Sequence, residues 1–347
     1  MTKSVSNKRV RVAFYGTGHW VQTVHIPNLF QIDNVDIVAL CDTNQQALDA
    51  AAAILGPGSA QTFTDGHEML AAKEILGEID VLFSCVPAFA RTDVEIAAAH
   101  KGIAIFSEKP QALELKTAQA IDAAIQAAGV LSTVGTRERY RPLLQAIRHF
   151  LADKEIIHVQ CSLPRSDAGG SWVRDEDRSG GYALDWGQHA VDYVRFMTGE
   201  NITTAQAFYM RPAAESFSLA SSFNFQLTNG ASMALTFVNY LAEGEVKAGR
   251  SNLPLFTIYY RGGRLDIYRE GRDRWSYEHN GEAVIDREVF DPWLAQDRAF
   301  IEAVRTGDDR AVLNDYHDGL YSLAPILAGW ASAQNGGIPI QLGAFMA

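Results

Sequence analysis

The stretch Arg9-Val10-Arg11-Val12-Ala13-Phe14-Tyr15-Gly16-Thr17-Gly18 decides the fold. Its first seven residues have the apolar, β-branched and aromatic composition that predicts a buried strand. The two glycines that follow predict a tight turn into a helix, because only glycine lets backbone N–H groups approach a pyrophosphate this closely. We therefore expect a strand–turn–helix unit in which Gly16 and Gly18 contact the phosphates of a dinucleotide.

Strand and helix patterns alternate from this turn to about residue 137. After the turn, an amphipathic stretch continues to about Ile32. Further strands are predicted at residues 35–41, 80–86, 103–106 and 130–134, and helices at 44–55, 68–76, 92–100 and 116–128. Such alternation indicates βαβ units and a parallel sheet. We assign residues 1–137 to a dinucleotide-binding Rossmann domain of the α/β class.

The residue that ends the second predicted strand indicates which dinucleotide binds. A carboxylate at the position of Asp42 accepts hydrogen bonds from the adenosine ribose and repels a 2′-phosphate, so we predict NAD rather than NADP. Val21 departs from the expected pattern, which usually has Gly or Ala at this third position. An ordinary α/β turn followed by a capping aspartate is the alternative.

The second part of the chain, residues 138–347, changes character. Helices are predicted at residues 142–151, 181–197, 293–306 and 316–335, a strand at 156–163 and a polar loop at 164–179. Repeated strand and turn signals, among them Asn229-Gly230 and Gly262-Gly263, run from residue 203 to 289 and predict antiparallel hairpins. We expect an α+β domain whose mostly antiparallel sheet has five or six strands in this region.

Composition excludes several classes of protein. Hydrophobic residues make up 47% and charged residues 20% of the chain, as in globular proteins rather than disordered ones. The net charge of −11 repels phosphate backbones, so we expect no nucleic-acid partner. No apolar run is long enough to span a membrane, and the N-terminus has no secretory pattern. Three scattered cysteines indicate buried thiols in a reducing cytoplasm.

The first candidate for chemistry is Glu108-Lys109-Pro110, which follows the strand at 103–106. Ligands bind at the carboxyl ends of parallel strands. A lysine held there beside a nicotinamide is placed to bind or protonate a substrate oxygen. Taken alone, the motif is more often a surface lysine before a turn-forming proline, which is the alternative interpretation.

The second candidate is the pair Asp185 and His189 in the helix predicted at residues 181–197. Residues four apart lie on one face of a helix, and a carboxylate beside an imidazole sets its orientation and stabilises its charged form. Such a pair can remove a hydroxyl proton. A structural pair and a metal site are the alternatives; two ligands without a further motif make us expect no metal.

The order of these motifs along the chain resembles one known family. Gly16-Thr17-Gly18 is followed by His25-Ile26-Pro27, Glu108-Lys109-Pro110 and a Gly-Gly-x-x-x-Asp-x-Gly-x-His-x-x-Asp block at residues 180–192. This order is similar to the glucose–fructose oxidoreductase/inositol dehydrogenase/rhizopine catabolism (Gfo/Idh/MocA) family, from about residue 9 to about residue 342. The resemblance implies that the second domain has an open sheet whose exposed face forms a homo-oligomer, a dimer or tetramer.

The resemblance also implies roles for individual residues. Lys109, Asp185 and His189 are expected to carry the chemistry, with the proton moved by either Lys109 or His189. The cofactor residues expected besides the two turn glycines and Asp42 are His19, Trp20, Pro87, Glu108 and Lys109. The catalytic segments of the two domains are expected to converge on the reactive ring of the coenzyme.

Substrate contacts are predicted from a second group of side chains. Arg91 stands where the family often has histidine, and Arg139 where an arginine often faces the cleft. Trp172 and Arg174 lie in the polar loop, where an aromatic face and a nearby donor suit a sugar ring. His189 is expected to contact the substrate as well. For the two arginines and the loop pair, solvated surface positions are the alternative.

Together these motifs predict an NAD-dependent dehydrogenase. It would oxidise a secondary hydroxyl of a sugar, cyclitol or sugar derivative to a ketone, or carry out the reverse reduction. The alternatives are an NAD-assisted glycoside hydrolase of the same family and a non-catalytic NAD- or sugar-binding regulator.

Overall fold

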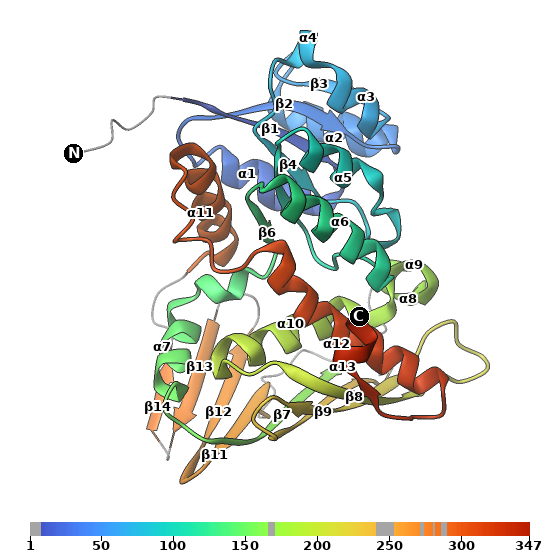
Figure 1. Ribbon diagram of the computed structural model, residues 1–347, viewed down its shortest axis with the longest axis vertical. Coiled ribbons are helices and arrows are strands. Elements are labelled where there is room, and N and C mark those ends of the chain that lie inside the picture. The colour runs from blue at the N-terminus through green and yellow to red at the C-terminus, as the bar shows by residue number, and fades with distance from the viewer. Residues whose placement is uncertain (1–7, 166–170, 241–252, 271–273, 280–281, 286–289) are drawn as a thin grey trace. The chain divides into compact units, whose positions relative to one another are not determined.

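The computed structural model describes residues 8–165, 171–240, 253–270, 274–279, 282–285 and 290–347 (Figure 1). The chain folds into two compact units. The first unit consists of Met1–Tyr140 and Pro292–Leu320, and the second of Arg141–Asp291 and Tyr321–Ala347. Both units are therefore built from two separate segments of the sequence.

The first unit is organised around a parallel sheet of six strands. They are β1 (Val10–Tyr15), β2 (Val35–Cys41), β3 (Gln61–Phe63), β4 (Val81–Ser84), β5 (Ala104–Ser107) and β6 (Ser132–Val134). Their order is β3-β2-β1-β4-β5-β6 and every pair is parallel, which confirms the predicted Rossmann architecture. The strand order reverses between β1 and β4, and ligands of such sheets bind at the carboxyl ends of the strands beside this point.

Helices connect these strands, and one more helix follows the last strand. They are η1 (Val21–His25), α1 (Ile26–Leu29), α2 (Gln45–Leu55), α3 (Gly66–Ala71), α4 (Lys73–Leu76), η2 (Ala88–Ala90), α5 (Asp93–His100), α6 (Leu115–Ala128) and η3 (Arg137–Tyr140). The Asn44 side chain caps α2 by accepting hydrogen bonds from Gln46 and Ala47. After the glycine turn, the predicted amphipathic stretch is a π-helical turn, η1, that leads directly into α1.

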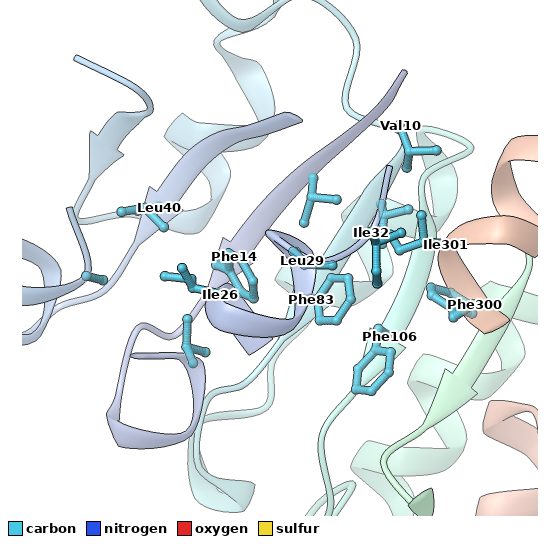
Figure 2. Close-up of a cluster of buried hydrophobic side chains, with 14 of the residues drawn as sticks. Val10, Phe14, Ile26, Leu29, Ile32, Leu40, Phe83, Phe106, Phe300 and Ile301 are labelled. Carbon is cyan, nitrogen blue, oxygen red and sulfur yellow. The ribbon is translucent and has the colours of Figure 1, made fainter. Parts of the chain in front are cut away.

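Helix α11 (Pro292–Thr306) belongs to the first unit, although the sequence places it in the second domain. Its Phe300 and Ile301 are completely buried in the core of the Rossmann sheet, beside Phe83 and Phe106 (Figure 2). The Phe106 and Phe300 rings meet edge to face at 5.8 Å between centroids. The apolar face of α11 is visible in the sequence, but nothing local to it specifies which sheet it covers.

The second unit contains a nine-stranded, mostly antiparallel sheet. Its strands are β7 (Ile156–Arg165), β8 (Ile202–Met210), β9 (Ala220–Leu227), β10 (Ser232–Asn239), β11 (Phe256–Tyr260), β12 (Gly263–Glu270), β13 (Arg274–His279), β14 (Glu282–Ile285) and β15 (Ile340–Gln341). The order is β14-β13-β12-β11-β7-β10-β9-β8-β15, and β7 and β10 form the parallel pair. The predicted fold class is confirmed, but the region 203–289 holds more described strands than the five or six expected.

Helices cover one face of this sheet (Figure 1). The helices of the second unit are α7 (Pro142–Leu151), α8 (Ser171–Arg174), α9 (Glu176–Ser179), α10 (Gly181–Thr198), α13 (Leu342–Met346) and the part of α12 (Tyr316–Gln334) that lies beyond Leu320. A Cβ at Gly329 would lie 2.5 Å from the Phe223 ring, so glycine lets α12 press closely on β9. In the described parts of the chain, no helix combines the length and apolar character needed to cross a bilayer.

Candidate functional site

The glycine turn after β1 has the geometry of a phosphate-binding loop. Gly16 has φ +90°, and a Cβ there would lie 2.7 Å from the backbone of Cys85 and Val86, so a larger residue would disturb the turn. Gly18 differs, because apart from Gly18 itself and its two chain neighbours nothing lies within 4 Å of the position that its Cβ would take. The backbone at Gly18 therefore borders open space, which fits the close approach of a pyrophosphate.

Asp42 lies directly beside this turn, at the end of β2. Its Oδ2 accepts hydrogen bonds from the backbone N–H of Thr17 at 2.7 Å and from the Thr17 hydroxyl at 3.2 Å. Its Oδ1 accepts one from the backbone N–H of Asn44 at 2.8 Å. A carboxylate oxygen has two lone pairs, so Oδ1 can accept a further hydrogen bond, as from a ribose hydroxyl. The turn and the acidic strand end together fit an NAD dinucleotide.

An aromatic group stands at the start of η1. The rings of His19 and Trp20 stack at 6.0 Å between centroids, and Trp20 meets Trp293 edge to face, also at 6.0 Å. The Arg137 guanidinium lies 4.0 Å above the Trp293 ring. Pro87, another predicted cofactor residue, is not part of this group and is exposed just after β4. Trp293 was missed in the sequence because it lies on α11, far along the chain from the glycine turn.

Glu108 and Lys109 follow β5, as predicted. Glu108 is buried; its Oε2 accepts a hydrogen bond from the backbone N–H of Lys109 at 3.0 Å, and its Oε1 lies 3.2 Å from Nε2 of His25. The carboxylate thus binds groups of the protein itself. This geometry favours a structural role for Glu108 over the cofactor contact predicted from the sequence.

His25 forms the centre of a cluster that sequence reasoning missed. Its Nδ1 lies 3.2 and 3.1 Å from the two carboxylate oxygens of Asp297 on α11, while its Nε2 faces Glu108. Asn28 donates a hydrogen bond to Asp297 Oδ2 at 2.8 Å. The motif His25-Ile26-Pro27 was the available signal, but its partner Asp297 lies too far along the chain to be inferred from it.

The two arginines predicted to bind substrate are both buried and bonded within the first unit. Arg91 donates hydrogen bonds to the Ser84 carbonyl and hydroxyl at 2.9 and 2.5 Å, and to the Glu108 carbonyl. Arg139 donates to the Leu313 carbonyl at 2.9 Å and pairs with Asp318. Both side chains tie segments of the fold together, and this geometry favours structural roles over the substrate contacts predicted for them.

In the second unit, Asp185 and His189 lie one turn apart on α10, as the sequence predicts. His189 is 3% exposed; its ring stacks on Tyr193 at 5.8 Å and meets Trp186 edge to face at 5.7 Å. The Arg269 guanidinium lies 4.9 Å from the Trp186 ring centre. Asp185 is half-buried. The His189 imidazole is therefore packed between two aromatic rings of its own helix.

Trp172 and Arg174 lie on the short helix α8 rather than in a loop. Trp172 is 39% exposed, and the Arg178 guanidinium lies 5.9 Å from its ring centre. Arg174 lies 5.9 Å from the Phe217 ring. Across the described ranges, no group of three or more His, Cys, Asp or Glu side chains is arranged to hold a metal ion.

Two family models match the chain. Residues 10–136 match the model described as an oxidoreductase family with an NAD-binding Rossmann fold. Residues 145–286 match the model of the GFO/IDH/MocA C-terminal domain. The two matched ranges lie in the Rossmann sheet and in the nine-stranded sheet, respectively.

Curated relatives include two sugar-active proteins by name. The D-apiose dehydrogenase of Paraburkholderia graminis is 35% identical over 207 residues, which cover 58% of this chain and 52% of that protein. The putative UDP-kanosamine synthase oxidoreductase subunit of Amycolatopsis mediterranei is 31% identical over 199 residues, 55% of this chain and 52% of that protein. The chain spans about half the length of the curated relatives it matches.

Solved structures show the same fold over nearly the whole chain. The aldose-aldose oxidoreductase of Caulobacter crescentus has a TM-score of 0.79 at 17% identity, covering 96% of this chain and 100% of that one. An oxidoreductase from Agrobacterium radiobacter, solved with NAD⁺ and L-tartaric acid, has a TM-score of 0.79 at 19% identity and covers 97% and 99%. At these identities the likeness concerns the fold alone.

Proposed function

The chain belongs to the Gfo/Idh/MocA family of NAD-binding oxidoreductases, and on this premise we propose that it is a sugar or cyclitol dehydrogenase. The reaction is the oxidation of a secondary hydroxyl to a ketone, with NAD⁺ as the oxidant, or its reverse. D-apiose and inositol dehydrogenases among the relatives support this substrate class.

The glycine turn with Asp42 is the observation that carries the cofactor part of this proposal. Gly16 makes the turn, Gly18 leaves its backbone open, and Asp42 stands beside both with an oxygen that can accept a further hydrogen bond. The two glycines would hold the pyrophosphate, and Asp42 would hold the adenosine ribose. When bound, NAD⁺ supplies the hydride acceptor at C4 of its nicotinamide.

The catalytic roles are assigned to Lys109, Asp185 and His189. His189 removes the proton of the substrate hydroxyl, Asp185 orients its imidazole and stabilises the charged form, and Lys109 assists the proton transfer. In the reverse direction the same groups return the proton to the ketone oxygen. The exposed Trp172 face and Arg174 are proposed to contact the sugar ring and its hydroxyls.

A panel of sugars, inositols and sugar acids with NAD⁺, followed by NADH absorbance, tests the activity. We expect NADH from at least one member and a lower rate with NADP⁺, because Asp42 repels the 2′-phosphate. Absence of NADH with every member contradicts the proposal. Release of sugar from a glycoside without net NADH indicates the hydrolase instead, and equal rates with both cofactors contradict the role of Asp42.

We also propose that the chain forms a dimer or tetramer through the sheet of its second unit. The face of this sheet that carries Phe208, Met210 and Tyr259 leaves these apolar side chains exposed. Light scattering during size-exclusion chromatography measures the mass directly. A monomer at micromolar concentration contradicts this part of the proposal.

A further inference from the structure

The Asp297–His25–Glu108 cluster is more elaborate than a packing contact requires. His25, Asp297 and Glu108 are 1%, 1% and 7% exposed, and they come from η1, α11 and the end of β5. The Phe83 and Phe106 rings also meet the imidazole in edge-to-face geometry, with centroids at 5.4 and 5.2 Å. Burying three ionisable groups is costly unless each is paired and hydrogen-bonded.

The positions of the two ring nitrogens define the charge of His25. Each nitrogen faces a carboxylate, and an ionised carboxylate only accepts hydrogen bonds. A neutral imidazole has one N–H and would direct a lone pair at the other carboxylate. The doubly protonated ring donates to both, so one positive charge is held between two negative ones.

The pKa values follow the same logic. Burial alone lowers the pKa of His25, but the charge and hydrogen bonds of Asp297 and then Glu108 outweigh it and raise the pKa to about 10. Burial likewise raises the pKa of Glu108, but His25, Lys109 and Arg137 outweigh it and lower the pKa. The Cys85 thiol nearby has its pKa raised by burial and stays neutral.

Glu108 links the cluster to Lys109, and both its carboxylate and its backbone carbonyl accept hydrogen bonds. Oε2 of the carboxylate accepts the backbone N–H of Lys109, and the Glu108 carbonyl accepts a hydrogen bond from Arg91. A Cβ at Gly135 would lie 2.9 Å from both carboxylate oxygens of Glu108. Only glycine at this position leaves enough space for the carboxylate. Glu108, which directly precedes Lys109, is therefore held by hydrogen bonds with His25, Arg91 and the Lys109 backbone.

We propose that Asp297, His25 and Glu108 form a charged clamp whose role is to position Lys109 for its part in the reaction. The three are positioning residues, since none is assigned a contact with the substrate. This inference rests on the proposed function for the catalytic role of Lys109, but the clamp itself is a property of the first unit.

Asp297→Asn and Glu108→Gln are the test variants. Each removes one negative charge and leaves a balanced pair of one positive and one negative group, so the fold is expected to survive. Glu302→Gln is the matched control, because it makes the same chemical change at a more exposed position of α11. Thermal unfolding and the dissociation constant for NAD⁺ are measured for all variants, and we expect wild-type NAD⁺ binding.

The kinetic test is a double-mutant cycle with Lys109→Ala. We expect Asp297→Asn to lower kcat about 10-fold with little change in KM, since a misplacement of about 1 Å can cost up to about 10²-fold. In the Lys109→Ala background we expect Asp297→Asn to change kcat less than about 2-fold, because groups that act through one another are not additive. An equal loss in both backgrounds, or no loss at all, overturns the clamp.

A second measurement does not depend on activity. Hydrogen exchange at the Lys109 amide, followed by NMR, is expected to be faster in Asp297→Asn and Glu108→Gln than in wild type and Glu302→Gln. Unchanged exchange overturns the clamp. If Lys109→Ala alone keeps the wild-type kcat, the catalytic assignment and the clamp both fail; if it loses activity while the cycle is additive, only the clamp fails.

Discussion

His25 of the first unit and His189 of the second are both almost completely buried, yet their surroundings differ sharply. His25 is held between the carboxylates of Asp297 and Glu108, and its pKa of about 10 keeps it protonated at neutral pH. His189 lies against the rings of Tyr193 and Trp186 on a helix that also carries Asp185. A histidine that stays charged can hold neighbouring groups in place but cannot exchange protons near pH 7.

The largest expected effect in this comparison is on stability, from His25→Gln. The change leaves Asp297 and Glu108 buried without the positive charge between them, and breaking a buried pair in this way costs about 3–5 kcal/mol. Urea unfolding near pH 7 measures this loss. A loss of less than about 1 kcal/mol would show that the cluster is not ionised as proposed.

The same variant gives a pH dependence whose sign is defined. Because folding raises the pKa of His25 from 6.5 to about 10, its contribution to stability is complete below pH 6.5 and is lost as the pH rises through about 10. The difference in unfolding free energy between wild type and His25→Gln should therefore shrink across this interval. A difference that stays constant contradicts the raised pKa.

The next effect is on catalysis, from His189→Ala. We expect kcat to fall about 10²-fold or more, since general acid–base groups contribute on this scale, while NAD⁺ affinity stays near wild type. Tyr193→Phe is a matched control that changes the ring stacked on His189 without removing the imidazole. Wild-type turnover in His189→Ala would contradict the proposed proton transfer by His189. It would also remove the functional contrast between His189 and His25.

The smallest effect is expected at a third histidine, His317. Its Nδ1 lies 2.7 Å from Asp122, and this hydrogen bond raises the pKa of His317, but half of the side chain is exposed. Solvent screens such a pair, so His317→Gln should change the unfolding free energy by less than about 1 kcal/mol. If His317→Gln lowers the unfolding free energy as much as His25→Gln does, burial is not the reason why the two histidine pairs differ in strength.

Local signals in the sequence were sufficient for much of the fold. The apolar strands β1, β2, β4 and β5 lie close to their predicted positions, and Asp42 ends β2 beside the glycine turn. The hairpin turn at Asn229-Gly230 joins β9 to β10 as predicted. These features are specified by residues close together in the chain, through side-chain periodicity and the freedom of glycine at positive φ.

The candidate site was less accessible to such reasoning. Arg91 and Arg139 were expected to meet a substrate, but their donors bond to carbonyls and carboxylates of the first unit. A cation near a strand end looks the same in the sequence whether its partner is a ligand or another part of the chain. The choice depends on segments such as α12, whose first residues supply Asp318.

The sequence by itself determined the strand–turn–helix start, the acidic end of β2 and the spacing that puts Asp185 and His189 on one helix face, because each depends on neighbours in the chain. Only the tertiary structure decided that α11 returns to the Rossmann sheet and brings Asp297 to His25. Its apolar face would suit many sheets. Complementary charge and packing across 272 positions of the chain select the one it covers, and no local pattern encodes that choice.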